Sequence, residues 1–419
     1  MNDHLYPSPQ LTELLSRLGV RSSSQSAPAD ALCIVASICN LTQIEHVHGA
    51  TVAATLRQIV HERARQICAS EPGIVSMSGE HILFVFDIQS WPELWDGLRA
   101  PRVTVLLERI LSSLGERPIE TPDGPILAVI SAAVAPWTEE PFDIAAVGSK
   151  AMAHQPGSLE WRDGYVADMN VAAALFNALD EDRLGFEWEP VRDAGSTGLT
   201  RYYEALLCEA DGGVVTRVGS LVPALERVGL VRRLDQWVVE SVIDTLRLNR
   251  NVCLGCNVSA QSARLDAWWA FIATALSEEP DIASRLIIEI TETAPFHDIA
   301  AARDFVESLQ SLGCRVALDD VGAGHSSLRA LIDLGVDIAK IDHAYVRQTS
   351  EDAVAAERLR QLIGLAKTCA ADVVVEGIES DEDAEISRKS GATWLQGYLF
   401  SRAGTASVKP SVGRIRDQR

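Results

Sequence analysis

The sequence predicts an α/β protein in which a TIM-like (β/α)8 barrel with one antiparallel strand follows a smaller α+β domain. Two observations predict this fold. From residue 185 onward, eight short apolar runs alternate with longer amphipathic runs, which is the pattern of a closed parallel barrel. In the first third of the chain, two short strands instead flank a turn signal, which is typical of an antiparallel sheet.

Length and charge restrict the class of protein. The 419 residues are enough for two or three domains, and 47% of them are hydrophobic. The formal net charge of -21 argues against binding to nucleic-acid polymers or anionic membranes, although it also serves solubility. The N-terminus has no signal-peptide pattern, and no apolar run is long enough for a membrane span. We therefore expect a cytoplasmic protein.

The cysteines indicate buried free thiols. There are eight, scattered along the chain and mostly within apolar runs, which fits a reducing compartment better than a disulfide framework. Cys253 and Cys256 form a CxxC pair, but no second pair or nearby histidine accompanies it. Structural thiols are therefore expected there, not zinc or redox chemistry.

The first third is expected to contain a flexible leader (1–28) and an α+β domain (29–162). Apolar alternation predicts strands at 31–39, 73–77, 81–87 and 126–134, and helical periodicity covers 43–68, 91–115 and 142–154. Residues 78–80 form the hairpin turn between the second and third strands.

This order of elements resembles the GGDEF-type diguanylate cyclase domain, but its functional motifs are missing. Where that family has Gly-Gly-Asp-Glu-Phe, this chain has Ser78-Gly79-Glu80-His81-Ile82. Where it has Asp-x-Asp-x-Phe-Lys, this chain has Ser37-Ile38-Cys39-Asn40-Leu41-Thr42. A cyclase needs carboxylates to hold two cations on its triphosphate. The resemblance therefore implies a degenerate domain without cyclase activity, which either senses a nucleotide such as GTP or is purely structural.

A helix at 163–184 is expected between the domains. Val171, Leu175 and Leu179 recur every four residues and form one apolar stripe. This helix either couples the two domains or only separates them.

The barrel is expected at 185–406, followed by a tail at 407–419. Its eight strands are predicted at 186–191, 203–207, 252–258, 286–291, 315–319, 338–341, 373–376 and 393–397. Helices are clearest at 231–249, 298–311, 326–334, 352–369 and 381–390. Only about 11 residues separate the first two strands, which is short for a crossover helix. We therefore expect that pair to be antiparallel.

Polar residues recur where the predicted strands end. Glu204 begins the second strand, and the others close later strands or follow them: Asn257, Glu289, Glu292, Asp319, Asp320, Lys340, Asp342, Glu376, Glu379 and Gln396. The C-terminal ends of barrel strands meet at one face, where active sites are built. Glu204 reaches that face if its strand runs opposite to its neighbour. We expect these side chains to converge.

Such an oxygen-rich site suits Mg2+ or Mn2+. Adjacent acids such as Asp319 and Asp320 repel each other and stay ionised together only near a cation, although a solvated turn is the alternative for that pair alone. Two ions can clamp a phosphodiester and stabilise its attacking and leaving oxygens. Lys340 is placed to hydrogen-bond the attacking water or to neutralise the transition state.

Residues 185–403 resemble the EAL-type cyclic di-GMP phosphodiesterases, because several motifs agree in order. They are EAL at 204–206, NVSA at 257–260, EITE at 289–292, DDVGAGHSSL at 319–328, AKID at 339–342, VEGIE at 375–379 and QGYLF at 396–400. The resemblance implies one metal held by Glu204, Asn257, Glu289 and Asp319, and a second held by Asp319, Asp320 and Glu376.

The resemblance also implies the remaining roles. Lys340 would orient the nucleophilic water, and Glu204 and Glu376 would act with it in catalysis. Gln396 and Leu206 would contact the substrate. Glu292 would hold the loop after Asp320, and Glu379 would support the metal site.

Departures from the family pattern concern the substrate. Glu189 stands where the family has glutamine, and Cys208 stands where an arginine follows Glu-Ala-Leu-Leu. The central loop reads Val321-Gly322-Ala323-Gly324-His325, and Arg402-Ala403 replaces a proline in the tail. We expect weakened substrate binding before lost chemistry.

These observations predict a phosphodiesterase that hydrolyses cyclic di-GMP to linear pGpG with two Mg2+ or Mn2+ ions. A catalytically silent cyclic di-GMP receptor acting through protein partners is the main alternative, and a scaffold that binds no nucleotide is the third. By analogy with the family, a homodimer is expected.

Overall fold

The fold is described from a computed structural model. The structure describes residues 31–70, 73–87, 99–135, 159–195, 199–291, 296, 298–322, 327–347, 349 and 353–401. The predicted leader, the helix expected at 142–154 and the tail at 407–419 lie outside these residues. Two compact units result, the first reaching to Ala173 and the second containing most of the chain from Ala174.

The first unit contains a four-stranded antiparallel sheet with the order β2-β3-β1-β6. Its strands are β1 (Ala31–Ile38), β2 (Gly73–Ser78), β3 (His81–Asp87) and β6 (Ile130–Ala135). The expectation of an antiparallel sheet in an α+β unit is confirmed. The strand expected at 126–134 starts later, because a small hairpin of β4 (Ile119–Thr121) and β5 (Gly124–Ile126) precedes it.

In the described part of the first unit, three helices accompany this sheet. They are α2 (Leu41–His48), α3 (Ala50–Ser70) and α4 (Arg99–Gly115). One helix was expected over 43–68, but the structure divides it at Gly49, whose φ of 89° is incompatible with a continuous α-helix. Sequence periodicity missed this break because both helices bury the same kind of apolar stripe.

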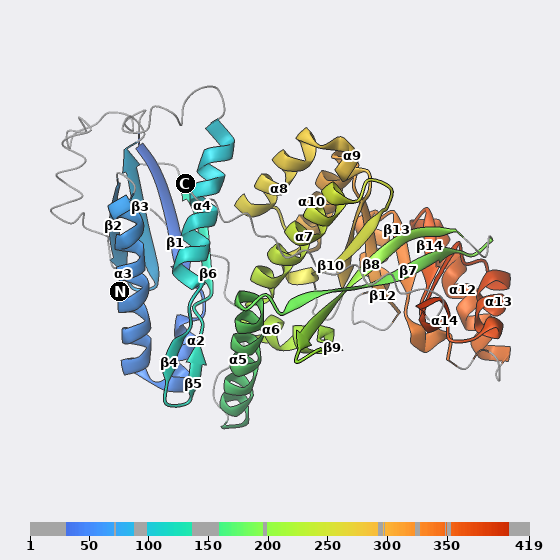
Figure 1. The fold of residues 1–419 in the computed structure, drawn as a ribbon, viewed down its shortest axis with the longest axis horizontal. Coiled ribbons are helices and arrows are strands. Elements are labelled where there is room, and N and C mark those ends of the chain that lie inside the picture. Colours follow the sequence, from blue (N-terminus) through green and yellow to red (C-terminus); the bar gives the residue numbers. More distant parts are fainter. Residues whose placement is uncertain are drawn as a thin grey trace. The chain divides into compact units, whose positions relative to one another are not determined.

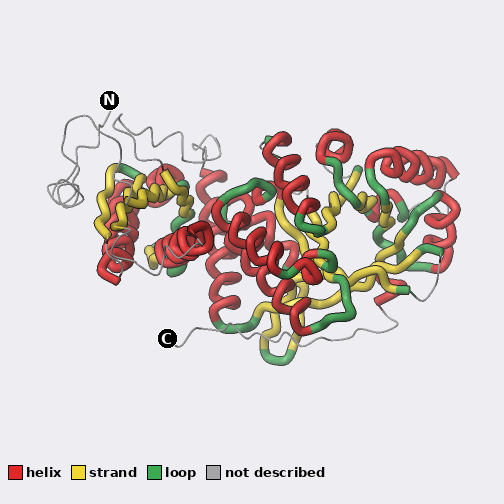
Figure 2. The backbone as a smooth tube through the Cα atoms, turned by 90° about the horizontal axis from the view of Figure 1, so that it is seen from above, coloured by secondary structure: helices red, strands yellow, loops and turns green. Residues whose placement is uncertain are grey.

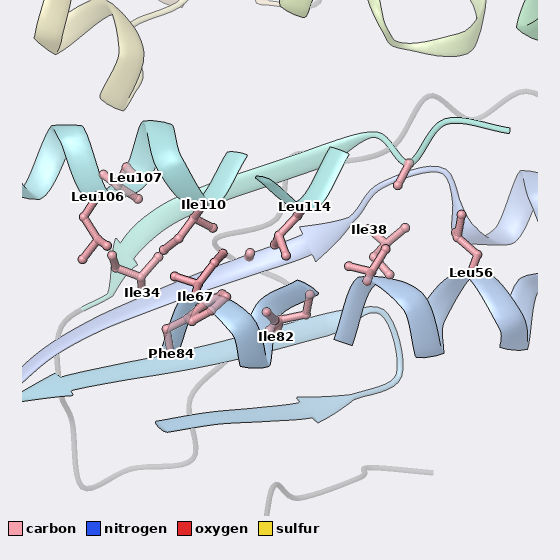
Figure 3. Packing of buried hydrophobic residues seen from close by; sticks show 14 of the residues in the cluster. Ile34, Ile38, Leu56, Ile67, Ile82, Phe84, Leu106, Leu107, Ile110 and Leu114 are labelled. Atoms are coloured by element: carbon pink, nitrogen blue, oxygen red, sulfur yellow. The ribbon is translucent and has the colours of Figure 1, made fainter. Parts of the chain in front are cut away.

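Helices α3 and α4 pack on one face of the sheet, and the core lies between these helices and the sheet (Figure 3). Ile34, Phe84 and Ile110 are fully buried there. Fully burying a side chain of this size contributes about 1.5–3 kcal/mol relative to leaving it in water. The first unit therefore has a hydrophobic core of its own.

Helix α5 (Leu159–Asp180) runs from the first unit into the second. Its Tyr165 hydroxyl lies 3.4 Å from the side-chain nitrogen of Asn40. The same Asn40 amide accepts from the backbone N–H of Val129 and donates to the carbonyl of Leu127, each at 2.9 Å. The helix expected at 163–184 thus exists but starts earlier and ends earlier, because β7 begins at Leu184.

The second unit is an eight-stranded barrel with one additional strand (Figure 1). The strands are β7 (Leu184–Asp193), β8 (Thr200–Asp211), β9 (Val214–Arg217), β10 (Leu254–Ser259), β11 (Leu286–Thr291), β12 (Arg315–Val321), β13 (Ile338–Ile341), β14 (Asp372–Val375) and β15 (Trp394–Gln396). Pairing of β8 with β10 closes the ring, and β9 extends β8 outside it. All eight predicted strands are present, whereas β9 was not predicted.

The exceptional strand of the barrel is β7, which runs antiparallel to both of its neighbours, β8 and β15. The prediction of an antiparallel first pair is confirmed. As a result β8 runs parallel to β10. Glu204 was expected at the start of its strand, but β8 begins at Thr200 and Glu204 lies inside it, opposite Gly255.

Helices surround the strands of the barrel (Figure 2). They are α6 (Val222–Val228), α7 (Val231–Leu248), α8 (Ala267–Glu278), α9 (Pro280–Ala283), α10 (Ile299–Ser311), α11 (Ser327–Leu334), α12 (Ala353–Cys369), α13 (Asp381–Ser390) and α14 (Tyr398–Ser401). No helix in the described part of the chain is long and apolar enough to cross a bilayer.

Candidate active site

The inside of the barrel has an apolar layer with a polar layer next to it. The apolar layer consists of Val191, Tyr202, Ile287, Ala317, Ile338, Val374 and Trp394. Alternate residues of a strand point to the same face. On the parallel strands, the residue two positions further on is polar in each case: Glu204, Glu289, Asp319, Lys340, Glu376 and Gln396. The strand register thus builds one ring of polar side chains at the C-terminal face.

Lys340 lies at the centre of this ring and is completely buried. Its Nζ is 2.5 Å from Glu289, 2.8 Å from Glu376, 3.0 Å from Glu204 and 3.1 Å from Asp319. One ammonium therefore contacts four carboxylates from four different parts of the barrel. A buried charge is tolerated only with such partners.

The five acids of this site, which we call the acid cluster, are Glu204, Glu289, Asp319, Asp320 and Glu376. Together with Lys340 they carry a formal charge of −4, since five carboxylates are opposed by one ammonium. Two divalent cations would cancel that charge. Without them the carboxylates repel one another in a buried site.

The pKa values within the acid cluster reflect this repulsion. Burial, followed by the charge of Glu204, raises the pKa of Glu289 to about 8. Burial and Asp319 raise the pKa of Glu376 well above its usual range. Burial would lower the pKa of Lys340, but the surrounding carboxylates outweigh it and hold the pKa well above normal. The lysine is therefore a permanent cation.

Glu204 is the exception, because two amides support its charge. Asn257 Nδ2 and Gln396 Nε2 each donate to a carboxylate oxygen of Glu204 at 2.6 Å. Burial would raise the pKa of Glu204, but Lys340 and these two amides lower it overall. Glu204 is thus held ionised and in one orientation.

The donor set fits divalent cations. Two groups of acids each offer oxygens within 4.8 Å of one another, and they share Asp319: one is Glu204, Glu289 and Asp319, the other Asp319, Asp320 and Glu376. Asn257 Oδ1 and Glu289 Oε1 are buried and accept no hydrogen bond from the described residues. Buried oxygens without donors are suited to a hard cation such as Mg2+ or Mn2+.

The end of β12 has an unusual backbone. Asp320 has a φ of 54°, in the left-handed region that asparagine and aspartate tolerate best. Burial, then the charges of Asp319 and Asp342, raise the pKa of Asp320 to about 7. Gly322, with a φ of 101°, lies against the ring of Tyr345, whose hydroxyl donates to the Gly322 carbonyl at 2.9 Å. Only glycine fits there.

Three predicted site residues lie elsewhere or outside the described chain. Glu292 is outside the described residues. Glu379 is exposed before α13 and does not join the acid cluster, and its backbone N–H donates to Asp383 at 3.3 Å. Leu206 is half-buried on β8, two positions after Glu204 and on the same face. The roles assigned to these residues stay predictions.

Sequence reasoning missed two residues of the site. Tyr202 is 1% exposed beneath Glu204, and burial raises its pKa well above the usual range. Gly255 leaves the space that the Glu289 carboxylate occupies. Both could have been found: Tyr202 precedes Glu204 by two, and a glycine within a strand often marks close packing.

Comparison with known proteins shows which family the second unit matches. Residues 172–403 match the family model of the EAL domain. The chain is 28% identical over 235 residues to the bifunctional diguanylate cyclase/cyclic di-GMP phosphodiesterase MucR of Pseudomonas aeruginosa, covering 54% of this chain and 34% of that protein. It is 27% identical over 206 residues to the cyclic di-GMP phosphodiesterase PdeF of Escherichia coli, covering 48% of this chain and 28% of that protein. The matched part thus spans about a third of these curated relatives.

A solved structure resembles more of the chain. The S helix-GGDEF-EAL part of Vibrio cholerae LapD aligns with 89% of this chain and 89% of its own length, with a TM-score of 0.51. The sequence identity is 14%, so this likeness concerns the fold alone.

We predict that Gly255→Ala destabilises the barrel. An added Cβ would lie 2.2 Å from Glu289 Oε1 and 2.8 Å from the ring of Tyr202. Overpacking of this kind costs about 1–3 kcal/mol, to be measured by urea unfolding. Gly364→Ala is the control, because the new Cβ meets nothing within 4 Å on α12. It should be neutral or stabilise by up to about 1 kcal/mol, and equal losses in both variants would contradict the packing argument.

We predict opposite effects of Glu289→Gln with and without cations. In EDTA at pH 7, the pKa of about 8 keeps wild-type Glu289 mostly protonated, and this uptake of a proton on folding costs stability. The neutral glutamine avoids that cost, so the Tm of the variant should rise by about 2–4 °C. Added Mn2+ should raise the Tm of the wild type, since a cation at 100 times its Kd adds about 2.7 kcal/mol, but should raise that of the variant much less.

Thermal unfolding measures both effects. Glu357→Gln is the matched control, because this glutamate lies exposed on α12 and pairs with Arg360 at 2.6 Å. It should behave like the wild type under both conditions. A wild-type Tm that ignores both Mn2+ and Mg2+ would argue against a cation site in the acid cluster.

Proposed function

The chain belongs to the EAL domain family, and we propose that its barrel hydrolyses the second messenger cyclic di-GMP to linear pGpG. The observation that carries this proposal is the buried Lys340 among four carboxylates, next to two acid groups that share Asp319. The relatives named as cyclic di-GMP phosphodiesterases support the choice of substrate.

We assign two cations to the acid cluster. Glu204, Asn257, Glu289 and Asp319 would hold one, and Asp319, Asp320 and Glu376 would hold the other. Two Mg2+ or Mn2+ ions supply Lewis-acid stabilisation of a phosphodiester and lower the pKa of a water molecule. The carboxylates and the Asn257 oxygen supply the hard ligands that these ions prefer.

The protein's own groups then position the reactants. Hydrolysis adds the oxygen of water to phosphorus, breaks one P–O ester bond and transfers a proton to the leaving oxygen. Lys340 remains protonated beside the reacting group, where it either hydrogen-bonds the attacking water or stabilises negative charge that develops on the phosphate. Gln396, already bonded to Glu204, and Leu206 on the same strand face would contact the substrate.

We propose that the first unit is a degenerate GGDEF-like domain without cyclase activity. The likeness of fold to the LapD structure supports this assignment. At the end of β1, Ser37 Oγ lies 2.8 Å from His81 Nδ1, and Cys39 Sγ lies 3.2 Å from Ser131 Oγ. Neither Ser37 nor Cys39 offers the carboxylate that a cyclase uses for its cations. We therefore propose that this unit either senses GTP or has a purely structural role.

A catalytically weak or silent receptor for cyclic di-GMP is the second candidate. The anionic Glu189 and the uncharged Cys208 favour it, since both occupy positions where the family has residues suited to an anionic ligand. A receptor would bind the nucleotide in the barrel and signal through a protein partner or through a homodimer.

The turnover assay tests the proposal. We expect the purified protein to convert cyclic di-GMP to pGpG in the presence of Mn2+ or Mg2+ and to lose this activity when EDTA is added. Chromatography measures the product. Glu204→Gln should reduce kcat by at least about 100-fold, because the neutral amide no longer balances a cation. Glu357→Gln on the outside of the barrel is the control and should retain wild-type activity.

Calorimetry separates the alternatives. Binding of cyclic di-GMP without turnover would favour the receptor, and the absence of binding would favour a scaffold. The same assay repeated with GTP tests the first unit: a change in kcat or KM would indicate a nucleotide-sensing domain, and no change would indicate a structural one.

A further inference from the structure

Strand β7 also contributes one inward-facing residue to the polar layer. Because β7 is antiparallel, this residue precedes the apolar-layer residue instead of following it. Val191 lies in the apolar layer, and β7 runs antiparallel to its neighbours. The polar layer on this strand is therefore reached two residues earlier, at Glu189. Glu189 lies directly opposite Glu204 in the strand register, where side chains of an antiparallel pair have their Cβ atoms about 5 Å apart.

A cation from β9 faces this carboxylate. Arg217 lies opposite Cys208, which shares the face of Glu204 because it follows at an interval of four residues on β8. Its guanidinium donates to Glu187 at 2.6 Å and to Glu189 at 3.0 Å. Strand β9, which was not predicted, thus brings the positive charge of Arg217 beside Cys208, the position at which the family has an arginine.

Contacts connect Arg217 with the acid cluster. Arg217 binds one oxygen of Glu189, and the other oxygen of Glu189 accepts from Gln396 Nε2 at 3.2 Å. The same Gln396 nitrogen donates to Glu204 at 2.6 Å. The orientation of Gln396 is therefore coupled to Arg217, whereas Glu204 is also held by Asn257 at 2.6 Å and by Lys340 at 3.0 Å.

The low solvent exposure of Glu189 makes its contact with Arg217 important. The Glu189 side chain is only 11% exposed, whereas Arg217 is 49% exposed. A carboxylate so little hydrated depends on a partner for its charge. Cyclic di-GMP carries two phosphodiester groups, and an unbalanced charge on Glu189 would repel them where they enter the barrel.

We propose that Arg217 is a positioning residue for substrate binding, which neutralises Glu189 and thereby keeps Gln396 directed at the acid cluster. This inference rests on the proposed binding of cyclic di-GMP. It differs from direct contact of Arg217 with a phosphate, because the effect of Arg217 on KM then depends on the charge of Glu189. Glu187, the other partner of Arg217, is 36% exposed, so water screens its charge.

A double-mutant cycle distinguishes these two possibilities. Arg217→Ala should raise KM for cyclic di-GMP about tenfold, with kcat within about twofold of wild type, because Asn257 and Lys340 still hold Glu204. Glu189→Gln should lower KM, because it removes a negative charge while keeping an oxygen for Gln396. Arg217→Ala combined with Glu189→Gln should bring KM back to within about twofold of wild type.

The other outcomes overturn the inference. If the double variant binds as weakly as Arg217→Ala, then Arg217 contacts the substrate itself. If Arg217→Ala lowers kcat or the Mn2+ affinity and leaves KM unchanged, its role is structural. Arg360→Ala, which removes an exposed arginine paired with Glu357 on α12, is the matched control and should change nothing.

Failure of this inference is distinguishable from failure of the proposed function. Should the protein bind cyclic di-GMP without hydrolysing it, the same cycle is measured as Kd by calorimetry with the same expected ratios. If the wild type does not bind cyclic di-GMP at all, the proposed function and this inference both fail.

Discussion

A single buried ammonium, Lys340 Nζ, lies within 3.1 Å of carboxylates from four segments that are distant in sequence. Burying one charge in a barrel is unfavourable, and placing five acids beside it, three of them buried and two half-buried, is more so. The arrangement persists because the lysine, the amides of Asn257 and Gln396 and, under the proposed function, two cations compensate for the lost hydration. Most other features of the barrel's interior follow from this requirement.

The geometry of the barrel supplies the positions. An apolar layer closes the interior, and on each strand that contributes a core residue to it the next inward residue is polar, whereas β10 has Gly255 at this level. Gly255 leaves room for Glu289, and the left-handed backbone at Asp320 directs a second acid to the mouth of the barrel. The site is therefore a property of strand register and of two special backbone positions, more than of any single motif.

The antiparallel strand β7 adds a constraint that a regular barrel lacks. It lets β8 present Glu204 in the correct direction, and it also brings Glu189 into the polar layer. An additional negative charge there requires compensation, which the hairpin of β8 and β9 provides through Arg217. Two departures from the family pattern, at Glu189 and Cys208, can thus be understood as one linked change.

By itself the sequence determined the barrel, its strands and nearly all members of the polar ring, because period-two alternation and strand ends are local signals. It also indicated the antiparallel first pair, through the length of one connection. It did not reveal the helix break at Gly49, strand β9, or the parts played by Tyr202, Gly255 and Arg217. These depend on which strands pair, in which direction and in which register, and pairing is decided by packing between residues far apart in the chain.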